Sequence, residues 1–467
     1  MGVYRALVVL MKLDKKETDM GKKKKKRKKN KGTMKWWQLS LIGVGCTIGT
    51  GYFLGSAIGI KQTGPSIAIS FILAAIGTYI VFNLLAKMTA DDPQAGSFCY
   101  YARKAYGDWA GFGAGWNYWS CNILIMGSQL TALSTLSRFW FPNVPLWVFA
   151  SGYAVLAIAV VLLGTKGFDK VENLFAVIKL AAIVMFIIIA LCAVFGAIKG
   201  TGASPKLPTE MGEIFKKGFK GFWASLIYAF YAYGGIEVIG LMAMQLKKKE
   251  DAPKSGTIML IVLTIIYVAS LVLAVSLVGY GAFNHKESPF VTALKDYKLA
   301  FFPHVFNACI IIGGFSTMTA SLFGVTNLLV TMSESKDAPA FFAKKIKKMK
   351  DLPLPSLGLA TVGLILSIVT ALLLPGKIYE YITTAAGILI LYNWGFIILS
   401  AFKLLEVKMK DKVFGGIGLL LLAAAITGTL AEKEIRPGFF ASLALVAIIA
   451  FVTMRVTKKR KKSEESA

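Results

Sequence analysis

The sequence CTIGTG, residues 46–51, lies near the middle of a long apolar stretch that covers residues 36–60. A second apolar stretch, residues 221–244, contains FYAYGGIE at residues 230–237. Each glycine inside a helix costs about 1 kcal/mol relative to alanine. We therefore predict that both stretches are helices that break near their centres. The alternative is close packing between helices through small residues, and we assign that role to Gly55 and Gly59.

Apolar composition extends far beyond these two stretches. Hydrophobic residues make up 56% of the 467 positions, and the mean hydropathy is +0.62. A helix of about 20 apolar residues crosses the hydrocarbon core of a bilayer. We predict an all-α integral membrane protein with twelve transmembrane helices. These cover residues 36–60, 65–88, 107–137, 144–164, 170–198, 221–244, 256–282, 300–332, 356–375, 378–403, 413–431 and 437–456.

The distribution of charge predicts the orientation. The chain has 53 Lys and Arg residues against 25 Asp and Glu residues. If the N-terminus is inside, cytoplasmic segments carry about three times as many cations as external ones, as the positive-inside rule requires. We therefore expect a cell membrane protein with both termini in the cytoplasm. The basic tails, residues 1–35 and 457–467, are expected to attract anionic lipid headgroups and not nucleic acid.

Helix breaks in the middle of a membrane free main-chain groups for binding. Backbone N–H groups become free on one half-helix and C=O groups on the other. The first can hold a carboxylate and the second an ammonium, and an amino acid carries both groups on one carbon. Lipid offers no other partner, so such breaks should line a cavity. Five spans separate the two breaks, which is the spacing of a five-helix repeat used twice in opposite orientations.

Ionisable side chains also occur inside the predicted spans. Lys179 lies deep in its span, where a charge should face the interior of the bundle. We interpret it as a proton-coupling or cation-substituting amine, with a static ion pair to Glu172 as the alternative. Thr317 and Ser321 are four residues apart on one helix face and are its candidate partners. Glu237 follows the second break, as a gate or as a cap on the outer half-helix.

Other kinds of site are not indicated by the sequence. The five cysteines are not clustered, and only two histidines are present. We therefore predict no metal site and no cofactor. The absence of a recognisable nucleophile–base pair argues against an enzyme.

The quoted motifs resemble those of the amino acid–polyamine–organocation superfamily of permeases, over nearly the whole membrane region. The most specific similarity is PQAGSF at residues 93–98, followed by Gly111–Phe112 and Gly115–Trp116. IGTG at residues 48–51 and GIE at 235–237 resemble the superfamily's breaks in helices one and six. The resemblance implies an inverted-repeat fold. Its two five-helix repeats would cover residues 36–198 and 221–403, and residues 413–456 would add two C-terminal helices.

The resemblance also implies which residues meet the substrate. They are Ile48, Gly49, Thr50, Gly51, Tyr231, Ala232 and Gly234. Tyr231 or Tyr233 is expected to act as a lid over the substrate, with packing in the core as the alternative for both. The missing side chain at Gly234 is expected to leave room for a sizeable substrate. Lys179 matches a lysine that replaces the sodium ion of related symporters in several members.

From these features we expect a secondary active transporter that carries an amino acid and is coupled to protons, not sodium. Glu237 is the single acidic residue expected near the pocket, which favours a neutral aliphatic or aromatic substrate over a cationic one. Two alternatives remain open. One is an exchanger of amino acids or amines, and the other is an amino acid receptor of the same fold that does not transport.

Overall fold

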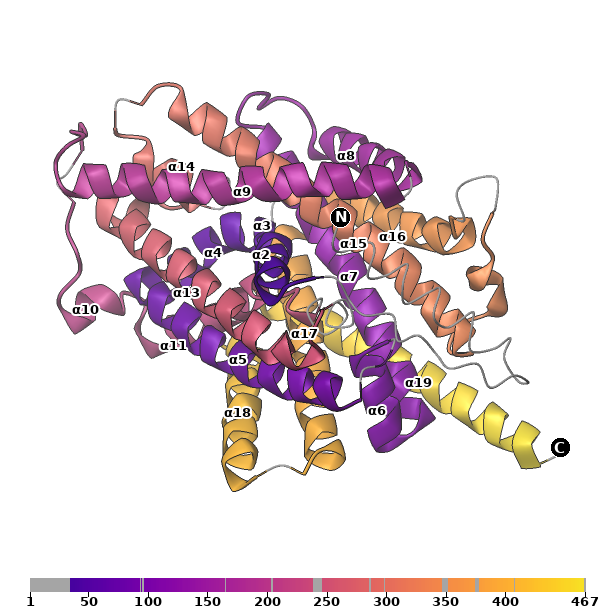
Figure 1. Cartoon of the computed structure of the whole chain (residues 1–467). Coiled ribbons are helices and arrows are strands. Elements are labelled where there is room, and N and C mark those ends of the chain that lie inside the picture. The colour runs from indigo at the N-terminus through magenta and orange to yellow at the C-terminus, as the bar shows by residue number, and fades with distance from the viewer. Residues whose placement is uncertain are drawn as a thin grey trace.

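The computed structural model is helical throughout the residues it describes, apart from isolated β-bridges (Figure 1). The described residues are 34–92, 94, 96–163, 165–202, 205–237, 246–284, 287–297, 299–346, 352–373, 378–406 and 408–465. Most of the predicted N-terminal tail lies outside these ranges.

Helices occupy the stretches predicted to cross the membrane. The first stretch is divided into α2 (Trp36–Thr47), α3 (Thr50–Phe53) and α4 (Gly55–Thr63), and the sixth contains α11 (Gly218–Ala232). The other long helices are α5 (Ile67–Asp91), α7 (Asp108–Ser137), α8 (Leu146–Leu162), α9 (Thr165–Val194), α13 (Ala252–Leu277), α15 (Phe302–Glu334), α16 (Leu354–Leu373), α17 (Ile378–Leu404), α18 (Met409–Ala431) and α19 (Arg436–Glu465). Short helices α6 (Phe98–Tyr106), α10 (Met211–Ile214) and α14 (Pro289–Leu294) lie between them.

Length and composition make many of these helices suitable for a bilayer. Within the part of the chain that the structure describes, seven helical stretches are long and apolar enough to cross a bilayer, and the first of them, Thr50–Asp91, has 42 residues. The others are Leu174–Val194, Ala252–Leu277, Phe302–Glu334, Tyr379–Leu404, Met409–Ala431 and Arg436–Arg460. Large apolar side chains such as Val177, Ile265 and Leu420 are exposed on the outside of the bundle. That surface is stable in lipid and not in water, so the protein is a multi-pass membrane protein.

The broken first helix lies inside the bundle. Figure 1 shows α2 and α3 in the middle of the molecule, with α9 running along one side and α18 towards the periphery. Helix α9 lies against α13 and α15, and α7 lies against both α15 and α17. Elements from both halves of the chain therefore surround the interruption in the first helix.

Glycines set how closely several helices approach. A Cβ atom on Gly428 of α18 would lie 2.3 Å from the carbonyl oxygen of Trp223 on α11. One on Gly221 of α11 would lie 2.1 Å from the carbonyl oxygen of Gln62 on α4. Close backbone approach at small residues is how membrane helices gain packing energy. The helices α4, α11 and α18 consequently form a tight stack behind the first break.

The two glycines assigned to packing differ from each other. A Cβ on Gly59 would lie 2.6 Å from Cδ1 of Ile67, so a side chain there would require the end of the Ile67 side chain to shift. A Cβ on Gly55 would meet only the hydroxyl of Tyr379, at an ordinary contact distance of 3.6 Å. Packing is therefore tighter at position 59 than at position 55, where a methyl group has room.

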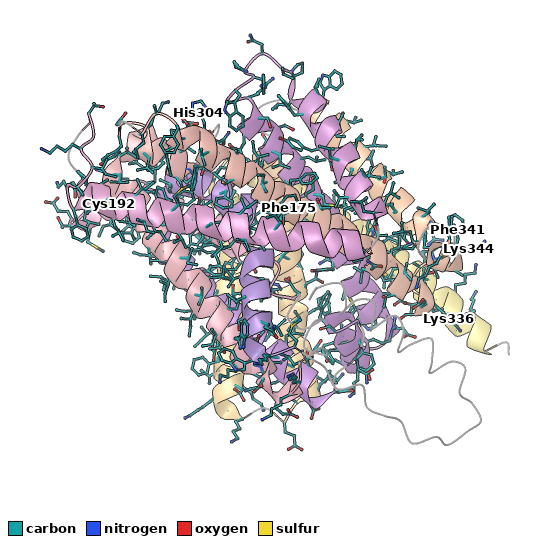
Figure 2. All side chains as sticks on the ribbon, turned by 45° about the horizontal axis from the view of Figure 1, so that its top comes forward. Phe175, Cys192, His304, Lys336, Phe341 and Lys344 are labelled. Carbon is teal, nitrogen blue, oxygen red and sulfur yellow. The ribbon has the colours of Figure 1, made fainter. Side chains whose placement is uncertain are left out.

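One end of the bundle is tied together by ion pairs around Asp337, which is 6% exposed. Its carboxylate pairs with Arg103 of α6 and, at 3.3 Å, with Arg460 of α19. Arg460 also donates to the carbonyl of Lys336, which Figure 2 shows beside the C-terminal helix. Helix α19 thus continues to Glu465, past the predicted end of its span at residue 456, and its basic end is fixed to the loop after α15.

We expect Gly428→Val to destabilise the protein by about 1–3 kcal/mol, because the new side chain must push α18 away from the backbone of α11. The measurement is the thermal unfolding of purified protein in detergent. Gly416→Val is the matched control, since Gly416 lies on the same helix and has no atom within 4 Å of its Cβ position. Equal melting temperatures for the two variants would contradict the close approach of α11 and α18.

Candidate functional site

The predicted interruption of the first helix is present in the structure. Helix α2 ends at Thr47, and Ile48 (φ −70°, ψ 108°) and Gly49 (φ −144°, ψ −166°) are extended. The first bonds of α3 run from the N–H groups of Tyr52 and Phe53 to the carbonyl of Gly49, at 3.1 and 3.0 Å. The N–H groups of residues 49–51 precede these bonds and have no acceptor within the helix. They form the partly positive end that the sequence predicted.

The other glycine-containing stretch, residues 221–244, is also interrupted. Helix α11 ends at Ala232, and the N–H group of Gly234 bonds to the carbonyl of Tyr231, at 3.0 Å, in a tight turn. Gly235 has φ 105°, a conformation that favours glycine over residues with a side chain. The carbonyl of Ala232 accepts a hydrogen bond from the hydroxyl of Tyr267 on α13, at 3.1 Å. Residues 238–245 lie outside the described part of the chain.

The two breaks meet at Gly51 and Tyr231. A Cβ on Gly51 would lie 2.7 Å from Cδ1 and Cε1 of the Tyr231 ring, so the ring covers this glycine. The Tyr231 hydroxyl donates to Ser128 of α7, at 3.4 Å. Tyr233 instead packs against the rings of Phe71 and Tyr267. Of the two tyrosines, it is Tyr231 whose ring contacts the first break.

The space beside Gly234 is not open in this structure. A Cβ there would lie 2.9 Å from Cδ1 of Ile390 on α17 and 3.1 Å from the carbonyl oxygen of Tyr231. The expectation that the missing side chain leaves room for substrate was therefore wrong for this conformation. The sequence alone could not reveal this, because Ile390, whose Cδ1 fills the space, lies more than 150 residues further along the chain.

Helix α15 contacts both Lys179 and the first break, and α9 also contacts α2 directly, since a Cβ on Gly45 would lie 3.1 Å from Cβ of Ala176. A Cβ on Gly49 would lie 3.1 Å from Oγ1 of Thr317, and one on Gly313 would lie 3.1 Å from Cβ of Lys179. Thr317 also hydrogen-bonds the carbonyl of Gly314, at 2.9 Å, so these contacts share one helical turn. Lys179 is fully buried. The predicted coupling residue and the predicted binding break thus contact the same turn of α15.

Ser321 lies further from this cluster. It is two turns beyond Gly313, or about 12 Å along the helix axis, and it is partly exposed. Lys179 contacts α15 at Gly313, in the turn that ends with Thr317. The side chain of Glu172, the alternative partner of Lys179, is outside the described part of the structure.

Glu237 is buried and bonded to its surroundings at both oxygens. Its Oε2 accepts from the N–H group of Gly235, at 3.0 Å, and its Oε1 accepts from Nε1 of Trp394 on α17. The side chain is 1% exposed. The carboxylate thus satisfies a donor freed by the second break and anchors the break to α17. The outer half-helix that Glu237 was expected to cap or gate lies outside the described residues.

Several residues at the site were not singled out from the sequence. Tyr379 of α17 donates to the carbonyl of Thr50, at 3.1 Å, and Thr383 of the same helix is 2.7 Å from Ser128 of α7. Gln129 of α7 donates to Thr317, at 3.0 Å. The available signal was the presence of polar side chains in otherwise apolar spans, which is strongest for Gln129.

Comparison with known proteins identifies relatives over most of the chain. The model of the amino acid permease family matches residues 38–413. An uncharacterized transporter of Bacillus subtilis (strain 168), YcgH, is 53% identical over 435 residues, which cover 93% of this chain and 97% of the relative.

Two further relatives are more distant. The uncharacterized amino acid permease YtnA of Bacillus subtilis (strain 168) is 30% identical over 373 residues, 78% of this chain and 79% of the relative. The aromatic amino acid transport protein AroP of Escherichia coli (strain K12) is 28% identical over 376 residues, 80% of this chain and 82% of the relative.

These relatives are transporters, and the matched family implies an amino acid as the substrate. The resemblance noticed in the glycine-containing breaks and in the stretch after residue 93 is therefore confirmed across the membrane region. By this match, which covers most of its length, the chain belongs to the amino acid permease family.

Proposed function

We propose that this protein is a secondary active transporter that moves a neutral amino acid across the cell membrane. The observation that carries the proposal is the meeting of the two helix breaks at Gly51 and Tyr231. One break offers N–H groups that no helix acceptor satisfies, and the ring at the other covers them. A carboxylate at residues 49–51 would receive these donors, and the end of α2 would offer carbonyl groups to the ammonium.

The proposed architecture has twelve spans arranged as two inverted five-helix repeats. Residues 36–198 and 221–403 form the repeats, and residues 413–456 form two further helices. The proposal is supported by the matching place of the interruptions, which fall in the first predicted helix of each repeat. Both termini are placed in the cytoplasm, where the basic tails at residues 1–35 and 457–467 would face anionic lipids.

A neutral substrate is favoured by the surroundings of the breaks. Both oxygens of Glu237 already accept hydrogen bonds from the protein, so this carboxylate is poorly placed to bind a cationic side chain. The name of AroP describes aromatic amino acid transport, which agrees with an aromatic or aliphatic substrate here. A receptor that does not transport remains an alternative, and net uptake by the purified protein would exclude it.

Proton coupling is assigned to Lys179. Its side chain is buried in α9 and contacts the turn of α15 that also contacts Gly49. A change of charge on this buried amine would act directly on the binding break. Exchange of one solute for another is the competing transport mode. Counterflow without any net uptake would favour it.

Gly51→Ala is expected to reduce amino acid binding and uptake at least about tenfold, because the methyl group would overlap the Tyr231 ring and displace it from the break. Gly55→Ala is the matched control, with one turn between the two positions and room for the methyl group. Uptake of radiolabelled amino acids into proteoliposomes measures the effect. If Gly51→Ala transports as well as Gly55→Ala, the two breaks do not form the binding site.

Lys179→Ala is expected to fold and bind amino acid but to lose its response to a pH gradient. Wild-type uptake should increase when the liposome interior is made alkaline and should not respond to a sodium gradient. The control is Lys199→Ala, which removes an exposed lysine beyond the end of α9. Proton-driven uptake that persists in Lys179→Ala, or wild-type uptake that requires sodium, would contradict the assigned coupling.

A further inference from the structure

Gln129 of α7 presents a buried acceptor without a partner beside the first break. The side chain is 5% exposed, and its Nε2 donates to Oγ1 of Thr317, at 3.0 Å. Its Oε1 is buried and has no hydrogen-bond partner among the described residues. Buried polar atoms in native proteins are nearly always satisfied, so an unsatisfied one beside the helix break is a candidate contact for the substrate.

The orientation of this amide follows from the proton count at Thr317. Its hydroxyl has a single proton, which it donates to the carbonyl of Gly314, at 2.9 Å. While it makes this bond, the hydroxyl oxygen accepts from Gln129, and this arrangement places the NH₂ group of the amide on the side of Thr317. A flipped amide would place two acceptors against each other. The carbonyl oxygen of Gln129 is consequently the atom left for a ligand.

A second unsatisfied atom lies at the same break. Oγ1 of Thr50 is buried and also lacks a partner among the described residues. Thr50 is fully buried. A Cβ on its neighbour Gly49 would lie 3.1 Å from Oγ1 of Thr317, and Thr317 is the residue that Gln129 contacts. Two unsatisfied polar atoms, one from α7 and one from α3, thus lie beside the same short stretch of extended backbone.

We infer that Gln129 determines specificity by accepting a hydrogen bond from an N–H or O–H group on the side chain of the transported amino acid. The inference rests on the proposed transport function and narrows its substrate class. The preferred substrates are neutral amino acids with a side-chain donor, such as tyrosine, tryptophan or threonine. Phenylalanine and valine have nearly the same shapes as tyrosine and threonine but leave the Gln129 oxygen unsatisfied, which is a strong basis for rejection.

The side chain of the substrate suits this position better than its ammonium group. Lys179 contacts Gly313, one turn from Thr317, so a protonated amine there would repel a second cation at Gln129. The carbonyl groups at the end of α2 provide a separate place for the ammonium. A neutral donor encounters no such repulsion, and a neutral amide oxygen is a fitting acceptor for it.

The test compares matched pairs of amino acids with purified full-length protein in detergent. Binding of tyrosine against phenylalanine, and of threonine against valine, is measured by calorimetry for the wild type, Gln129→Met and Gln62→Met. Gln62 is a buried glutamine of α4 outside the site and controls for loss of a buried amide. In the wild type, at least one donor-bearing member should bind about tenfold more tightly than its partner.

Gln129→Met should abolish that preference by weakening the donor-bearing member alone, and Gln62→Met should preserve it. Equal wild-type affinities within both pairs would overturn the inference but leave amino acid transport intact. Equal weakening of both members by Gln129→Met would also overturn it, since Gln129 would then hold the common zwitterion. If no amino acid binds to the wild type, the proposed function itself fails.

Discussion

Unsatisfied main-chain groups in a membrane are the constraint on which this structure depends. A helix interruption exposes N–H and C=O groups that lipid cannot bind, so the protein must supply partners or leave them for a ligand. Some partners are visible: Tyr379 bonds the carbonyl of Thr50, Tyr267 bonds that of Ala232, and Glu237 accepts from the N–H group of Gly235. Helices α13 and α17 therefore support the breaks, and the proposed function assigns the N–H groups of residues 49–51 to the substrate.

Much of the fold was predictable because its causes are local in sequence. Apolar runs of about 20 residues specify membrane helices, and glycine clusters specify where a helix is easily interrupted. Both interruptions occur where the glycines predicted them, at residues 48–49 and after Ala232. The short buried helix α14 was not predicted, because its burial depends on contacts such as Phe290 against Tyr52 rather than on its own pattern.

The details of the site were less predictable because they depend on contacts between distant segments. Ile390 fills the space beside Gly234, and no property of residue 234 reveals that. Tyr231 and Tyr233 are the same residue type and lie two positions apart, so the sequence does not distinguish their roles. Tyr231 covers Gly51 and Tyr233 packs on α13, because successive helical positions point about 100° apart. The polar side chain of Gln129 was visible in the sequence, but its unsatisfied oxygen depends on where Thr317 donates its proton.

The geometry also indicates how substrate and proton can be coupled over a short path. Lys179 contacts Gly313 and Gly49 contacts Thr317, and these two positions of α15 are one turn apart. A charge that appears on the lysine acts on the break through a low-dielectric interior, where electrostatic interactions are far stronger than in water. The coupling between the lysine and the break then needs no conformational change that passes through distant parts of the protein. The same turn holds the amide of Gln129 in place, so under the proposed function the coupling lysine and the amide that recognises the substrate would contact one turn of α15.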